Sequence, residues 1–148
     1  MIKNLDSLIF SNNFEYAKRL VESIDFKTFS EEILYNAIII VVLFIIVFLN
    51  YLLIENETSK IHDLAFSLLV NPLSHLEGAY NSALYHALRS VELTNRKDVG
   101  SLENLLFLNT IPDKLISDEE AIKICKEILK LDNKNELAKE SLSELLQN

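Results

Sequence analysis

One segment in the first half of the chain constrains the fold more than any other feature. Residues 37–49 form an unbroken apolar run, and the apolar character resumes after Asn50 and continues to Ile54. A helix that is apolar on every side must be covered by lipid or by protein. The segment 36–54 is therefore either a single membrane span or a buried central helix of an otherwise helical protein.

The length of this segment and its flanks favour the buried helix. The unbroken run covers only about 20 Å at about 1.5 Å per residue, whereas the apolar core of a bilayer is about 30 Å thick. Extending the segment through Asn50 to Ile54 brings it only to the minimum length of a transmembrane helix. The flanks carry mixed charge and the chain has no Trp, so the features that orient and anchor a span are weak. We expect the other helices to cover 36–54, with a single span as the alternative.

The rest of the chain is expected to be helical. Two glycines and two prolines in 148 residues leave few places for tight turns. The clearest helix is 75–93, whose apolar residues recur at three-and-four spacing and whose small residues at 79, 83 and 87 form one ridge. Ser30 and Ser117 are candidate helix caps. Further amphipathic helices are expected over 3–10, 14–23, 61–70, 99–108, 118–131 and 137–146.

The predicted fold class is all-α, and no strand pattern of useful length is present. We expect one domain over 1–148, in which helices of 1–74 precede helical pairs in 75–148. In the helix over 61–70, the residues expected to face inward are Ile61, Leu64, Ala65 and Leu68. No basic region followed by an apolar core and a cleavage site opens the chain, so a secretory signal is not expected and a cytoplasmic location is.

The charge balance narrows the class of partner. The chain has 14 basic and 22 acidic residues, for a net charge of −8, and each half carries −4. A protein that binds a phosphate backbone needs a basic footprint, so nucleic acid is not an expected partner. An acidic surface steers a basic partner toward it, although the same charge also serves solubility alone.

The residues that could carry chemistry form no recognisable site. The histidines are His62, His75 and His86, and the last two would share a helix face if both lie in one helix. No zinc-ligand spacing and no glycine-rich phosphate loop is present, so neither a metal nor another cofactor is expected. Cys125 is the only cysteine, which rules out an intrachain disulfide, and it lies on an apolar helix face. An enzyme is therefore not expected.

Two segments of the second half repeat each other. "ALYHALRSVELTN" (83–95) aligns without a gap with "AIKICKEILKLDN" (121–133), and both lead through a polar turn into another helix. The ending "KLDNKN" at 130–135 resembles that of the tetratricopeptide repeat, with Asn133 where that family usually has proline. The resemblance covers 76–146 and implies a tetratricopeptide-like array of helical pairs in the C-terminal half.

The stretch "NPLSHLEGAYNSALYHALRSVEL" (71–93) resembles small helical bacterial proteins of toxin–immunity loci. This resemblance implies a cytoplasmic protein that binds and blocks one toxin domain and performs no chemistry. The expected partner is a basic toxin, for example a ribonuclease. The alternative is a membrane-anchored adaptor with a single span over 36–54 in the inner or plasma membrane.

Acidic residues and one tyrosine are the candidates for contacting a basic partner. The simpler interpretation is that these side chains form a solvated face and that their negative charges stabilise the positive N-terminal ends of helices. The functional interpretation is an acidic patch with an aromatic anchor. The candidate residues are Glu55, Glu57, Tyr85, Asp113, Asp118, Glu119, Glu120, Glu136 and Glu140.

Overall fold

A computed structural model of the chain describes residues 11, 13–23 and 25–147, and within the helices it leaves the side chains at 14, 17, 26 and 29–38 undescribed. The described residues form helices and no strand, which confirms the all-α class. The helix expected over 3–10 lies outside the described residues. The helices are α2 (Phe14–Glu22), α3 (Phe26–Glu55), α4 (Ser59–Val70), α5 (Ala79–Leu93), α6 (Val99–Thr110), α7 (Asp118–Leu131) and α8 (Glu136–Gln147).

The chain divides into two compact units, Met1–Ile45 and Ile46–Asn148. The boundary lies inside α3. The first unit holds α2 and α3 as far as Ile45. There Asp25 caps α3, because its carboxylate accepts hydrogen bonds from the backbone N–H and the hydroxyl of Thr28, at 3.0 and 2.6 Å. The expectation that Ser30 caps this helix is wrong, since Ser30 lies inside it.

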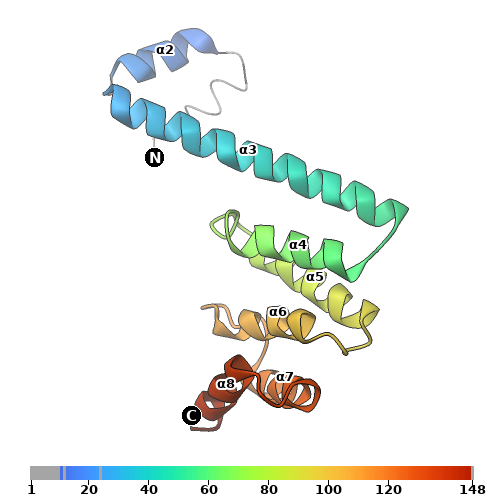
Figure 1. Ribbon diagram of the computed structural model, residues 1–148. Helices are drawn as coiled ribbons and strands as arrows, with labels where there is room; N and C mark the ends of the chain where they lie inside the picture. The colour runs from blue at the N-terminus through green and yellow to red at the C-terminus, as the bar shows by residue number, and fades with distance from the viewer. Residues whose placement is uncertain (1–10, 12, 24, 148) are drawn as a thin grey trace. The chain divides into compact units, whose positions relative to one another are not determined.

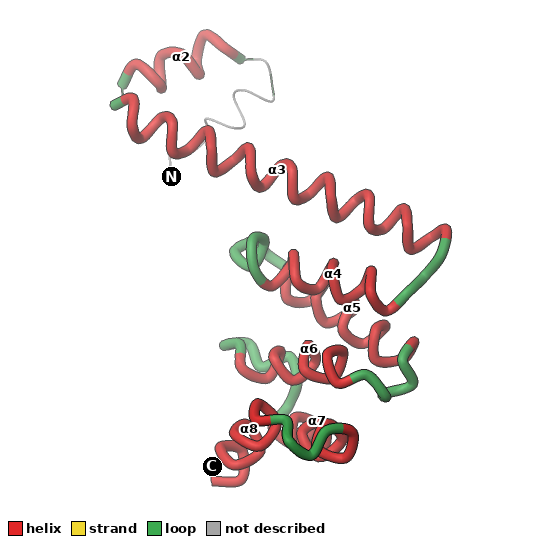
Figure 2. The backbone as a smooth tube through the Cα atoms, in the orientation of Figure 1, coloured by secondary structure: helices red, strands yellow, loops and turns green. Residues whose placement is uncertain are grey.

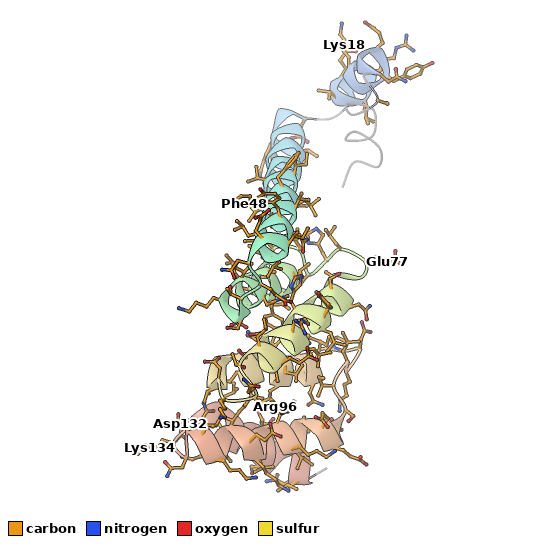
Figure 3. The ribbon with its side chains drawn as sticks, turned by 90° about the vertical axis from the view of Figure 1, so that its right-hand side faces the viewer. Lys18, Phe48, Glu77, Arg96, Asp132 and Lys134 are labelled. Carbon is orange, nitrogen blue, oxygen red and sulfur yellow. The ribbon has the colours of Figure 1, made fainter. Side chains whose placement is uncertain are left out.

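The apolar helix α3 is exposed over much of its described surface. In the second unit it buries Leu49 but exposes Val47, Phe48, Tyr51 and Ile54, of which Phe48 is labelled in Figure 3. The expectation that the other helices cover this helix on every side is therefore wrong for the described residues of the second unit.

Among the residues that the structure describes, no helix is both long enough and apolar enough to cross a membrane.

The helices of the second unit are stacked in chain order. Figure 1 shows α4, α5 and α6 following one another, with α7 and α8 side by side beyond α6, and Figure 2 shows that α4, α5 and α6 run back and forth. Each helix from α4 to α8 packs on the next, and α4 also contacts α6. Side chains cap α4, α6, α7 and α8 at their N-termini: Thr58, Asp98, Ser117 and Asn135 each accept a hydrogen bond from a backbone N–H three residues later.

One helix boundary and one helix face differ from the sequence prediction in this unit. The helix expected over 75–93 begins only at Ala79, after Gly78, whose φ of 79° lies in the left-handed region that glycine adopts without strain. His75 therefore lies outside α5 and does not share a helix with His86. In α4 the predicted inward face is turned by about one residue: His62, Ala65, Phe66 and Leu69 are buried, and Leu64 is exposed.

The internal repeat is visible in the pattern of burial, because the two aligned helices bury the same four aligned positions. In α5 these are Ala83, His86, Ala87 and Ser90, and in α7 they are Ala121, Ile124, Cys125 and Ile128. The first copy therefore places two polar side chains where the second copy has isoleucine.

Candidate functional site

The polar residues of the first copy meet a buried partner on each side of α5. His62 of α4 and His86 of α5 are 1% and 5% exposed, and their Nδ1 atoms are 2.8 Å apart. One proton lies between these two atoms, so one ring donates and the other accepts. Ser90 of α5 pairs with the buried Ser101 of α6, with 2.7 Å between the two hydroxyl oxygens.

Glu57 extends the histidine pair to the surface. This residue lies in the connection between α3 and α4, and its Oε1 accepts from the Nε2–H of His62 at 3.1 Å. The same carboxylate is held at both oxygens by the guanidinium of Arg89, at 3.0 and 2.7 Å. Arg89 also pairs with Glu92. The cluster of Glu57, His62, His86 and Arg89, called here the histidine cluster, ties the end of α3 to α4 and α5.

The protonation of the histidine cluster follows from its geometry. Hydrogen bonds from Arg89, and then from His62, lower the pKa of Glu57 to about 2, so this carboxylate is ionised at neutral pH. Burial, and then the charge of His62, lowers the pKa of His86 to about 4. Every member of the cluster already has a hydrogen-bond partner inside it, so the cluster is built to hold helices together.

Tyr85 covers the histidine pair. Its ring meets those of His62 and His86 edge-on at centroid distances of 6.0 and 5.2 Å, and the residue is 56% exposed. Glu57 and Tyr85, which the sequence nominates for partner binding, are thus brought together around His62.

The other candidate residues are spread over several elements. Asp118 is bound by Asn109 and by Lys114, which lower its pKa. Glu120 and Glu136 each pair with a lysine three residues later. The remaining candidates are exposed and make no ion pair among the described residues: Glu55 at the end of α3, Asp113 before α7, Glu119 in α7 and Glu140 in α8.

The one thiol of the chain is enclosed. Cys125 is fully buried, and burial raises the pKa of its thiol, which disfavours the reactive thiolate. No group of three or more His, Cys, Asp or Glu side chains is arranged to hold a metal ion in the part of the chain that the structure describes. A cavity of about 240 Å³ opens between α6 and α8, where Asn109, Thr110 and Lys114 face Ser141 and Glu144 over two leucines.

Sequence reasoning missed the histidine cluster. The available signal was a histidine on the apolar stripe of each of two successive helices, since His62 shares a face with Ala65 and Leu69, and His86 with Ala83 and Ala87. Two helices joined by a short connection pack on each other, so two such histidines are expected to meet. The sequence analysis places Ile61, Leu64, Ala65 and Leu68 on the inward face of α4. His62 is not on that face, so its meeting with His86 was not expected.

No family model, no curated protein and no solved structure matches this chain.

Proposed function

We propose that this protein is a non-enzymatic protein-binding module, and that it acts as an immunity protein that occludes a basic toxin domain. The observation that carries the proposal is the charge of the helical stack. Residues 46–148 hold 10 basic and 16 acidic residues, for a net charge of −6. A surface with this surplus is complementary to a basic partner and accelerates its approach.

The ion pairs within the helical stack do not remove its excess of acidic over basic residues. Five cationic residues of this unit pair with carboxylates, and the turn residue Arg96, which bonds Glu127 of α7 at 2.8 Å, is one of them (Figure 3). The pairing leaves Glu55, Asp113, Glu119 and Glu140 exposed toward solvent. These four carboxylates make no ion pair within the stack, and even exposed ion pairs contribute little to the stability of a fold. Their charges are therefore available to a basic partner.

Two further features support the immunity role. The resemblance of 76–146 to the tetratricopeptide repeat implies the helical pairs α5–α6 and α7–α8, whose members pack on each other, and such stacks offer broad binding surfaces. Tyr85 supplies an exposed aromatic ring beside the histidine pair, which is the kind of residue that anchors interfaces.

The experiment is affinity capture from cells that carry the gene, with the immobilised full chain and identification by mass spectrometry. We expect a basic protein to be retained at low salt and released as salt screens the charges. The variant E119K/E140K should retain at least ten-fold less of it, because each substitution reverses an exposed charge that makes no ion pair within the stack.

The matched control is E15K/E77K, which reverses two exposed acidic residues outside the candidate set and should capture as much as the unchanged chain. The proposal fails if the retained protein is not basic, or if both double variants lose it equally.

A further inference from the structure

The cavity between α6 and α8 has room for one side chain. Both helices pack on α7, and α8 turns Ala138, Ser141 and Leu145 toward the stack at intervals of three and four residues, which is one helix face. The small side chain of Ser141 leaves space in front of α6, and the cavity there measures about 240 Å³. Pockets for whole small-molecule ligands measure roughly 300–1,000 Å³, so this cavity suits a single side chain better.

Hydrogen-bond acceptors line one side of this cavity. The buried Asn109 uses both hydrogens of its amide, because Nδ2 donates to the carbonyl oxygen of Ile116 at 2.9 Å and to Oδ1 of Asp118 at 2.7 Å. These two bonds fix the orientation of the amide and leave its own Oδ1 to accept. The hydroxyl of Thr110 donates to the carbonyl oxygen of Phe107 at 2.8 Å, so its remaining capacity is also that of an acceptor.

The charge of the cavity is negative. Glu144 contributes an exposed carboxylate to the lining, and the exposed Glu140 lies one turn before it on α8. The cation of the lining is Lys114, whose Nζ lies 2.9 Å from each carboxylate oxygen of Asp118, so its charge is balanced locally. The cavity is therefore complementary to a cationic donor and not to a carboxylate or a phosphate.

We propose that this cavity receives the side chain of one arginine of the basic partner. The proposal rests on the proposed function and adds the point at which the partner is anchored. The arginine stem lies against Leu106 and Leu145, which form the apolar part of the lining. Its guanidinium, which carries only donors, faces Glu144 and the acceptors of Asn109 and Thr110. The compact ammonium of lysine reaches such a spread of acceptors less well, and arginine is enriched among the residues that dominate binding energy at interfaces.

Nuclear magnetic resonance of the full chain tests the cavity without the partner. The probe is propylguanidinium, which is the side chain of arginine alone. We expect it to shift the methyl signals of Leu106 and Leu145 with a dissociation constant of about 1 mM, which is what so small a fragment can reach. Butylammonium, the side chain of lysine, should bind at least about five-fold more weakly, and butyrate should leave both signals unshifted.

Two variants and a matched control locate the site. E144Q keeps the shape of the side chain but removes its charge, and it should weaken propylguanidinium binding at least about five-fold. S141L fills the cavity and should abolish the shifts with unchanged helix content. E119Q, which removes an exposed charge outside the cavity, should bind as the unchanged chain does. Absence of propylguanidinium binding, tighter binding of butyrate, or equal losses in E144Q and E119Q would each overturn the proposal.

The capture experiment distinguishes a failure of this inference from a failure of the proposed function. S141L should capture at least about five-fold less of the basic protein than the unchanged chain, because it closes the cavity to the arginine. Full capture by S141L, together with the loss expected for E119K/E140K, would overturn the arginine site and leave the proposed function standing. Capture of no basic protein would overturn the proposed function, and with it the arginine of the partner, even if propylguanidinium binds.

Discussion

Lowering the pH from 6.5 to 4 is expected to weaken the fold by up to roughly 3 kcal/mol through His86 alone. The pKa of His86 is lowered from 6.5 to about 4 in the folded chain. Between these values the unfolded chain binds a proton that the folded chain does not, so acid favours unfolding. The contribution is complete above pH 6.5 and is lost as the pH falls toward 4, where the folded chain must hold a protonated His86 in a buried position, 2.8 Å from Nδ1 of His62.

The measurement is the free energy of unfolding by denaturant at several pH values, for the unchanged chain and for H86Q. Glutamine can donate a hydrogen bond to His62 but does not titrate, so H86Q should lose most of the dependence between pH 6.5 and 4. H75Q, which removes an exposed histidine, should keep it. Equal pH slopes in the unchanged chain and in H86Q would contradict this account of the pair.

Glu57 adds to the acid sensitivity at lower pH. Its pKa of about 2 in the folded chain lies below the ordinary 4.5, so its contribution is present above pH 4.5 and is lost as the pH falls toward 2. This part should be the same in H86Q, which separates the two groups by the pH at which each acts.

Replacing Ile124 by alanine is expected to cost about 2–5 kcal/mol of stability. Ile124 is fully buried in α7, at the position where the first copy of the repeat has His86. The substitution removes apolar contacts and leaves a cavity, because α6 and α8 hold α7 from two sides and limit its collapse. L131A in the same helix is the matched control, since Leu131 is 45% exposed, and it should cost less than about 1 kcal/mol.

Thermal and denaturant unfolding of the two variants give this comparison directly. A loss for I124A no larger than that for L131A would mean that α7 is not packed as described, and the alignment of the two copies would lose its support.

The apolar pattern of the sequence predicts much of the helical stack. The ridge at 79, 83 and 87 is buried as expected, and the cap of α7 at Ser117 forms with the backbone N–H of Glu120. These features depend on local spacing, which the sequence displays. The pattern places the start of α5 too early because Leu76 fits the same spacing, whereas residues 71–78 form turns that end at the left-handed Gly78.

The errors arise where residues distant in sequence decide the outcome. The choice of inward face in α4 depends on its partner helix, so the pattern places Leu64 inside although it is 50% exposed. The covering of α3 cannot be derived from its apolar run, because such a run demands a cover without identifying one. The candidate acidic residues are identified by charge alone, and charge does not reveal that Asp118 is already bound by Lys114.

The most direct measurement of the central claim is a growth assay with the basic protein that the capture experiment identifies. That protein is expressed alone, with the unchanged chain, and with E119K/E140K. We predict that it arrests growth alone, that the unchanged chain restores growth, and that the charge-reversed variant does not. A captured protein that is harmless on its own, or equal rescue by both chains, would contradict the proposal that this protein neutralises a toxin through its acidic surface.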